Sequence, residues 1–131
     1  MRAVYVDTSV LVAVAFGEPA GAAIVRKLRR MDVLFGATLV ESEFLAAAAR
    51  EGVLDNARSM LDAVRFVHPP RRLTTEAELV LRHARLRGAD LHHLATALFL
   101  FPRPSAGFFL TLDAAQGEAA ATIGFGTLAD L

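Results

Sequence analysis

Two acidic side chains close apolar runs near opposite ends of the chain. Asp7 ends the run 3–7, Ala-Val-Tyr-Val-Asp. Asp113 follows directly on the run 108–112, Phe-Phe-Leu-Thr-Leu. Both runs are typical of buried strands, and active sites of open α/β sheets lie outside the carboxyl ends of such strands. Two carboxylates at one sheet edge repel each other, so a bound cation is the simplest reason for placing both there.

Two further acids have helical contexts. Asp90 stands at the start of an expected helix whose core-facing positions fall at i+4, i+7 and i+8. These positions are Leu94, Ala97 and Leu98. Glu43 lies one turn into another expected helix, and Glu41 competes with it because the periodicity does not decide which of the two faces inward. The candidates for one shared site are therefore Asp7, Glu43, Asp90 and Asp113.

Convergent carboxylates suit hard divalent cations. Mg²⁺ and Mn²⁺ prefer oxygen ligands, and Mg²⁺ typically keeps waters and substrate phosphate beside one or two carboxylates. One such ion supplies hydroxide at neutral pH, and two ions about 3.5–4 Å apart can clamp the attacking and leaving oxygens of a phosphodiester. The hydroxyls of Thr8, Ser9 and Thr111 are placed to orient the acids through hydrogen bonds. The pattern therefore indicates metal-dependent phosphodiester hydrolysis.

Each acid also has a purely structural explanation. Asp90 follows a Gly-Ala pair and would make a good helix N-cap, and Glu43 alone would be a solvated helix acid. Asp7 and Asp113 could each begin an Asx turn. The functional interpretation therefore depends on the combination and not on any single acid.

Other chemical patterns are weaker. Asp90 and His93 have the i, i+3 spacing of a zinc site, but no third ligand is evident. Arg26, Arg29 and Arg30 share one face of an expected helix, which is either a solvated face or a contact surface for an RNA backbone or an acidic partner. Glycine-rich phosphate loops and the Gly-x-Ser-x-Gly element are absent.

The apolar pattern alternates between the periods of strands and helices along the chain. It predicts strands at 3–7, 33–35, 108–112 and 123–125. It predicts helices at 10–16, 20–30, 40–50, 55–67, 74–87, 90–101 and 116–122. Gly52, Pro69-Pro70 and Gly88 are expected to end three of these helices. The alternation favours an α/β fold in which helices cover both faces of a mostly parallel sheet, in one domain spanning 1–131.

The composition is that of a globular protein. Of 131 residues, 54% are hydrophobic and 21% charged, and 14 basic residues balance 14 acidic ones. A net charge of zero offers no global argument for nucleic-acid binding. The absence of cysteine excludes disulfides and thiolate chemistry and is consistent with a cytoplasmic location. Asp7 interrupts the N-terminal apolar run, and 94–101 is too short to span a bilayer, so neither a signal peptide nor a membrane partner is expected.

The order of these residues resembles the PIN-domain family, and within it the VapC-type toxins of toxin–antitoxin pairs. A hydrophobic strand leads into Asp-Thr-Ser at 7–9, and the acid-apolar pair Glu43-Phe44 follows early in a helix. An Asp then opens an Ala-rich helix at 90–97, Thr-x-Asp closes a strand at 111–113, and Ile-Gly-Phe lies close to the end. The resemblance covers nearly the whole chain.

This resemblance implies a three-layer α/β/α fold and a Mg²⁺- or Mn²⁺-dependent endoribonuclease. It implies metal ligation by Asp7, Glu43, Asp90 and Asp113, and it favours Glu43 over Glu41. It also implies an RNA substrate, a homodimer and a cognate antitoxin protein as partner.

Two other classes of function remain open. A non-catalytic PIN-like module would act through protein contacts and would have no need of four acids. A phosphoryl-transfer enzyme would use Asp7 as nucleophile and Asp113 as metal ligand. The only lysine, Lys27, lies in the basic helix and not at a strand end where it could bind phosphate.

Overall fold

The computed structural model describes residues 1–131 and contains one sheet of four parallel strands, in the order β3-β2-β1-β4. The strands are β1 (Ala3–Val6), β2 (Val33–Ala37), β3 (Val64–Val67) and β4 (Phe108–Leu110). The helices are α1 (Thr8–Ala15), α2 (Gly21–Leu28), α3 (Thr38–Glu51), α4 (Leu54–Leu61), α5 (Thr74–Leu81), α6 (Gly88–Leu100) and α7 (Ala114–Ile123). Two short 3₁₀ helices follow α6 and α7, η1 (Pro104–Ala106) and η2 (Leu128–Asp130). None of the helices combines the length and apolar character that crossing a bilayer requires.

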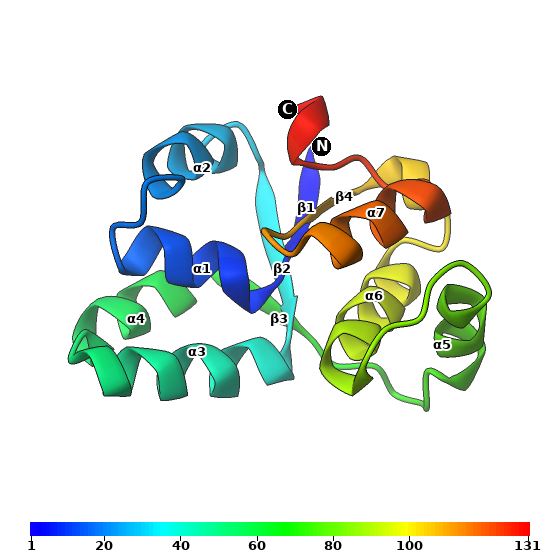
Figure 1. The fold of residues 1–131 in the computed structure, drawn as a ribbon, viewed down its shortest axis with the longest axis horizontal. Helices are drawn as coiled ribbons and strands as arrows, with labels where there is room; N and C mark the ends of the chain where they lie inside the picture. The colour runs from blue at the N-terminus through cyan, green and yellow to red at the C-terminus, as the bar shows by residue number, and fades with distance from the viewer.

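Helices cover both faces of the sheet (Figure 1). α1 to α4 lie on one face and α5 to α7 on the other. Side chains of β1 alternate between two apolar clusters, with Val4 and Val6 facing α1 to α4 and Ala3 and Tyr5 facing α5 to α7. A strand covered on both faces needs a continuous apolar run, which is what β1 has. The predicted three-layer α/β/α fold around a parallel sheet is confirmed.

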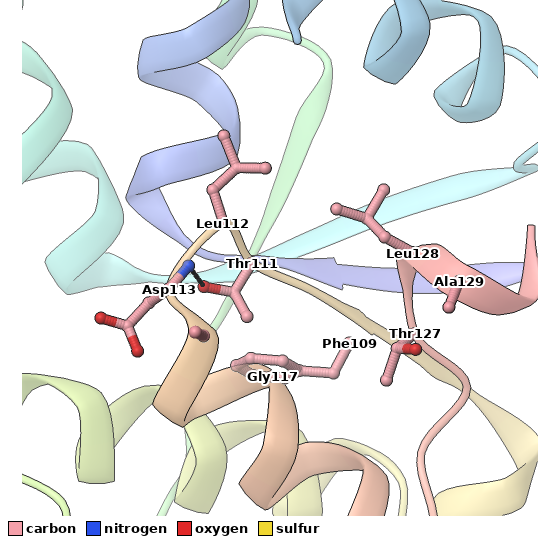
Figure 2. Close-up of a pocket in the computed structure, with 9 residues that line it drawn as sticks. Phe109, Thr111, Leu112, Asp113, Gly117, Thr127, Leu128 and Ala129 are labelled. Atoms are coloured by element: carbon pink, nitrogen blue, oxygen red, sulfur yellow. Dashed lines mark hydrogen bonds between the residues drawn. The ribbon is translucent and has the colours of Figure 1, made fainter.

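The two strands that lead into Asp7 and Asp113 are neighbours in the sheet. β1 and β4 pair with Val6 opposite Leu110, and the Asp7 amide donates to the Leu110 carbonyl at 3.1 Å. Thr111 follows β4 directly at the same edge (Figure 2). The chain leaves β1 through α1 on one face and reaches β4 from α6 on the other. The carboxyl ends of β1 and β4 therefore form a topological switch point, where open α/β sheets bind ligands.

Helices α3 and α6 carry the other two candidate acids. α3 buries Val40, Phe44 and Ala48 at i, i+4 and i+8, and Glu43 lies at the border of this stripe. The middle of α6, residues 93–98, is buried because the helix packs against β2, α5 and α7. Its exposed beginning carries Asp90 in the first turn. Both acids therefore lie on helices that are fixed by extensive packing.

The predicted helix at 55–67 is correct up to Leu61 and wrong beyond it. The chain instead forms α4 and then, after two turn residues, the edge strand β3. Leu61 and Val64 match a helical stripe, but Val64–Val67 pairs with Leu34–Ala37 in a parallel ladder. The strand sequence, Val-Arg-Phe-Val, is rich in β-branched and aromatic residues. Pairing with a distant strand therefore outweighs a local periodicity that is also compatible with a helix.

The predicted helix at 74–87 is shorter in the structure. α5 ends at Leu81, and Val80 is its only buried residue, so no apolar stripe extends it further. Gly88, expected to end this helix, instead begins α6. The segment 82–87 between the two helices is a loop.

The predicted last strand at 123–125 is absent. α7 continues to Ile123, and Gly124 ends it with φ of 120°, a conformation that favours glycine. Only Gly126 joins the sheet, through an isolated parallel bridge to Phe108. A Cβ at Gly126 would lie 2.5 Å from the Phe108 ring, so the close approach of this segment requires glycine.

We predict that Gly21→Ala destabilises the protein, although alanine normally favours a helix. Gly21 begins α2, and a Cβ there would lie 2.7 Å from the Ala13 carbonyl oxygen of α1. The added Cβ forces α1 and α2 apart, and this shift should lower the free energy of unfolding by about 1–3 kcal/mol, measured by urea denaturation.

The matched control is Gly88→Ala, because Gly88 also begins a helix but has no atom within 4 Å of the added Cβ. It should leave the free energy of unfolding unchanged or raise it slightly. Equal stabilities of the two variants would contradict the predicted contact between α1 and α2.

Candidate active site

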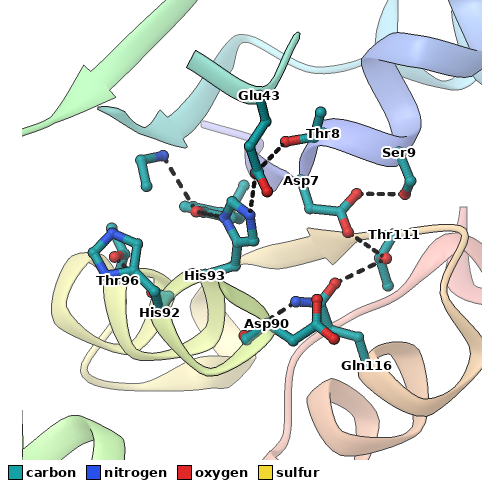
Figure 3. Close-up of polar contacts among 12 residues, drawn as sticks. Asp7, Thr8, Ser9, Glu43, Asp90, His92, His93, Thr96, Thr111 and Gln116 are labelled. Carbon is teal, nitrogen blue, oxygen red and sulfur yellow. Dashed lines mark hydrogen bonds and ion pairs between the residues drawn. The ribbon is translucent and has the colours of Figure 1, made fainter. Parts of the chain in front are cut away.

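Asp7 is held at the carboxyl end of β1 by two hydroxyl groups (Figure 3). Ser9 Oγ donates to Asp7 Oδ1 at 2.6 Å, and Thr111 Oγ1 donates to Asp7 Oδ2 at 2.6 Å. Ser9 Oγ in turn accepts from the Leu112 amide at 2.9 Å. Since Ser9 belongs to α1 and Thr111 follows β4, the Asp7 carboxylate connects the segments that follow β1 and β4.

The Asp7 carboxylate is buried without a cationic partner. Only 5% of the residue is exposed, and none of the ion pairs in the structure involves it. Burial raises the pKa of Asp7 above its ordinary value, and the hydrogen bonds from Ser9 and Thr111 oppose this shift. Asp7 occupies the N-cap position of α1 but makes no side-chain capping bond. The Val10 backbone in the first turn of α1 also opposes the rise in its pKa, so the beginning of this helix helps to hold the charge.

The hydroxyl of Thr111 faces two acceptors but has one proton to donate. Asp7 Oδ2 lies at 2.6 Å and Gln116 Oε1 at 3.0 Å, while the Asp113 amide donates to the same hydroxyl at 3.0 Å. When Asp7 is ionised, the shorter contact takes the proton. When Asp7 is protonated, it can donate to Thr111, whose own proton then serves Gln116. A protonated Asp7 therefore satisfies both contacts of the Thr111 hydroxyl, in agreement with the raised pKa of Asp7.

Glu43 receives two hydrogen bonds on one carboxylate oxygen. Thr8 Oγ1 donates to Glu43 Oε1 at 2.7 Å, and His93 Nε2 lies 3.1 Å from the same atom. The Glu43 side chain is 35% exposed, so it is accessible to a ligand. Glu41 is exposed and takes part in none of these contacts. The structure thus places Glu43, and not Glu41, against the start of α1.

His93 connects Glu43 to the interior of the sheet. Its Nδ1 lies 2.7 Å from the Tyr5 hydroxyl, which accepts a hydrogen bond from the Ala37 amide at 3.2 Å. Tyr5 is completely buried and His93 is 3% exposed. Burial raises the pKa of Tyr5, so its hydroxyl keeps its proton. Burial also lowers the pKa of the neighbouring His92.

Asp113 caps helix α7 at the exposed side of the site. Its Oδ1 accepts from the Gln116 amide at 2.8 Å, which is a helix N-cap bond and not the Asx turn considered for this residue. Its own amide donates to Thr111 Oγ1 (Figure 2). A shallow cleft of about 260 Å³ adjoins Asp113 and Thr111, and its other lining residues include Phe109, Gly117, Thr127 and Leu128.

Gln116 is completely buried and ties α6 to β4. Its Nε2 donates to the Asp90 carbonyl at 3.1 Å, and its Oε1 faces Thr111 Oγ1. Asp90 is the third residue of α6, and Arg87 occupies the N-cap position, so the capping explanation of Asp90 is wrong. Asp90 is half-buried, and its carboxylate makes no hydrogen bond with the protein.

The carboxylates do not form a closed metal cage. No three acidic or histidine side chains lie close enough together to hold a metal ion, so the predicted convergence of three or four carboxylates is not present. The zinc alternative is likewise not formed, because His93 contacts Tyr5 and Glu43 instead. The donor chemistry still fits a hard cation. Mg²⁺ commonly uses one or two protein carboxylates and completes its shell with water.

A comparison with known protein families identifies the fold. The family model of the PIN domain matches residues 4–100. The chain belongs to the PIN-domain family. The matched range includes Asp7, Glu43 and Asp90, while Asp113 lies beyond it. Among proteins of curated function, none matches the chain. PIN domains are generally nucleases that use divalent metal ions and act on nucleic acids.

Three polar side chains of this PIN domain, Tyr5, His93 and Gln116, have roles in the site that the sequence does not predict. Gln116 lies three residues after Asp113, which is the spacing of a capping box and could have marked it. The spacing of His93 from Asp90 suggests a zinc site, but the actual partners of His93 are Tyr5 on β1 and Glu43 on α3. Tyr5 is the one polar side chain of an otherwise apolar strand, which is the only signal that the sequence carries for it.

The predicted contact residues Arg26, Arg29 and Arg30 lie at the opposite edge of this PIN domain. All three are exposed on or just after α2, which leads into the start of β2. There the Asp32 amide donates to the carbonyl of Arg2, at the amino end of β1. Figure 1 shows α2 near both chain ends, whereas α1 starts at the other end of β1. The structure does not bring these arginines to the acids.

Replacing Asp7 by asparagine should raise the melting temperature at pH 7 in EDTA by a few degrees. Because the folded-state pKa of Asp7 is raised, the folded protein retains a proton that the unfolded chain releases at about pH 3.9. Asp7 therefore lowers stability as the pH rises from there through its folded pKa. The advantage of Asp7→Asn should shrink as the pH is lowered towards about 4 in thermal unfolding experiments.

Asp62→Asn removes one exposed negative charge remote from the site and controls for the change in net charge. The difference in melting temperature between Asp62→Asn and wild type should not change with pH in the same way. A melting temperature of Asp7→Asn that stays below wild type by a constant amount at every pH would argue against a desolvated carboxylate at this position.

Proposed function

We propose that this PIN domain is a Mg²⁺- or Mn²⁺-dependent endoribonuclease and the VapC-type toxin of a toxin–antitoxin pair. The observation that supports this best is the buried Asp7 carboxylate at the β1–β4 switch point, oriented by two hydroxyls and without a cation of its own. A site of this kind attracts a divalent ion, which matches the general chemistry of the family.

In the proposed mechanism the chain's carboxylates hold the metal and the hydroxyls fix the carboxylates. Asp7 and Glu43 would be the main residues that hold the ion, and Asp90 and Asp113 would contribute further negative charge to the same edge of the sheet. A divalent ion bound there would supply an activated water and offset charge on the scissile phosphate. Ser9 and Thr111 hold Asp7 and Thr8 holds Glu43, so ligand orientation is set before substrate arrives.

We propose that the phosphates of the RNA backbone bind to the loop between α5 and α6. This loop exposes four groups that carry or can carry positive charge, Arg82, His83, Arg85 and Arg87. It leads directly into the first turn of α6, which contains Asp90. Arginine forms forked contacts to phosphate, so cations at this rim can guide a polyanion past the acids. The cleft beside Asp113 offers room for a nucleotide that flanks the scissile bond.

The α2 arginines suit a different partner. Arg26 and Arg30 line a pocket of about 230 Å³ with Lys27. Arg26, Arg29 and Arg30 contact none of the four acids and lie toward the amino ends of the strands, so we assign this surface to the cognate antitoxin, through an acidic segment. In this proposal the toxin is a cytoplasmic homodimer with one nuclease domain spanning 1–131. The phosphoryl-transfer alternative gains no support, since the single lysine donates to the Leu128 carbonyl at 3.0 Å.

Asp7→Asn should abolish metal-dependent cleavage of a mixed pool of structured RNA. Removing a metal ligand forfeits several kcal/mol of transition-state stabilisation, so the rate should fall below about one thousandth of wild type. Cleavage is measured in Mg²⁺, in Mn²⁺ and in EDTA, with circular dichroism to show that the variant is folded.

The variant purified in parallel also controls for contaminating nuclease. Equal cutting by both proteins would assign the activity to a contaminant and would contradict the assignment of Asp7. Metal binding without cleavage of any RNA would favour the non-catalytic PIN-like module instead.

The double variant Arg85→Ala/Arg87→Ala should weaken RNA binding and its salt dependence. If each arginine neutralises one phosphate of a single strand, the slope of log affinity against log salt should become shallower by about 1.4. Binding is measured in an Asp7→Asn background, so that the RNA is not cut.

Arg29→Ala/Arg30→Ala is the matched control, since it removes the same charge from the opposite edge of the sheet. It should leave both the affinity for RNA and its salt slope unchanged. A larger loss in this control than in the loop variant would move the RNA surface to α2 and contradict our assignment.

A further inference from the structure

A continuous chain of hydrogen bonds runs from the sheet backbone to Glu43. The Ala37 amide donates to Tyr5 Oη at 3.2 Å, Tyr5 Oη lies 2.7 Å from His93 Nδ1, and His93 Nε2 lies 3.1 Å from Glu43 Oε1. These residues come from β2, β1, α6 and α3 (Figure 3). The chain thus connects four elements that are far apart in sequence.

The direction of each bond follows from counting protons. The Tyr5 oxygen accepts from the Ala37 amide, so its own proton is free for His93 Nδ1. A neutral imidazole that accepts at Nδ1 carries its proton on Nε2, and this proton then points at Glu43 Oε1. The opposite tautomer would set a lone pair of Nε2 against the carboxylate. One tautomer therefore satisfies every group in the chain.

We propose that Tyr5 and His93 are positioning residues that lock one oxygen of Glu43 and leave the other free for a divalent cation. This inference rests on the proposed nuclease function. Thr8 Oγ1 and His93 Nε2 both bind Oε1, so Oε2 keeps all of its lone pairs. A carboxylate held in this way presents one oxygen in a fixed direction, as outer hydrogen bonds commonly do for metal ligands.

A purely structural role explains these residues poorly. Tyr5 is 0% exposed and His93 3% exposed, and they lie beside an apolar cluster that includes Phe109, Leu94 and Val80. Burying polar groups is unfavourable unless every donor and acceptor is satisfied, whereas apolar side chains of similar size would fill the space without that requirement. His93 contacts Glu43, an acid of the candidate site, so a functional role accounts for placing this polar pair in the core.

The test compares His93→Gln with His93→Asn. Glutamine can place its amide nitrogen where Nε2 lies and so keep a donor for Glu43. Asparagine can keep an acceptor for Tyr5 but is one bond too short to reach Glu43. The readouts are the Mn²⁺ dissociation constant from electron paramagnetic resonance, the cleavage rate and the melting temperature.

We expect His93→Gln to keep Mn²⁺ affinity and cleavage close to wild type. His93→Asn should lose about tenfold or more in both, at a similar melting temperature. Equal metal affinities in the two variants, or losses that simply follow melting temperature, would overturn the positioning role even if the wild-type protein is an active nuclease.

Nuclear magnetic resonance of the imidazole nitrogens tests the chain independently of metal and RNA. Wild type should show the neutral His93 ring protonated on Nε2, and folded Tyr5→Phe should lose this fixed tautomer. A wild-type ring protonated on Nδ1, or on both nitrogens, would overturn the inference. A fixed Nε2–H tautomer in a protein that neither binds Mn²⁺ nor cuts RNA would support the hydrogen-bond chain but overturn both its role in metal binding and the nuclease function.

Discussion

The burial of one carboxylate at the end of β1 is the constraint on which the site depends. An ionised acid that is 5% exposed needs either a cation or several hydrogen-bond donors. The chain supplies hydroxyls, Ser9 from α1 and Thr111 from the end of β4. The Thr111 bond joins the end of β4 to the end of β1, and Ser9 does the same through the Leu112 amide. The contacts that orient Asp7 therefore also hold β1 and β4 together at the switch point.

The hydrogen-bond network around Asp7 extends to the other candidate acids. Thr111 also contacts the Gln116 side chain, whose amide nitrogen donates to the Asp90 carbonyl in the first turn of α6. The backbone amide of Gln116 donates to Asp113, which caps α7. On the other side, Thr8 and His93 fix Glu43. Each candidate acid is therefore either a member of this network or lies one bond from it. A disturbance at Thr111 would reach two helices and one strand together.

The parts of this arrangement that the sequence predicts are those encoded locally. Apolar runs that end in an acid indicate strand edges, so β1, β4 and the parallel sheet follow from the pattern. β3 does not, because Val64 satisfies a helical stripe as well as a strand and only its pairing with Leu34 decides. The contact between Tyr5 and His93 spans 88 residues and leaves no periodic signal. The sequence places Asp90 at the start of a helix, either as a site acid or as an N-cap, and α6 excludes the cap because it begins two residues earlier, with Arg87 at the N-cap position.

Hydroxyl donors at Asp7 also explain why no arginine occupies the centre of the site. An arginine beside Asp7 would neutralise it, lower its pKa and occupy the space that a cation needs. A hydroxyl stabilises the carboxylate more weakly and leaves lone pairs on both oxygens. The positive groups instead lie in the loop before α6, where they can contact a polyanion without competing for the acids. In the proposed function, this separation of charges would let one edge of the sheet attract both a cation and a phosphate chain.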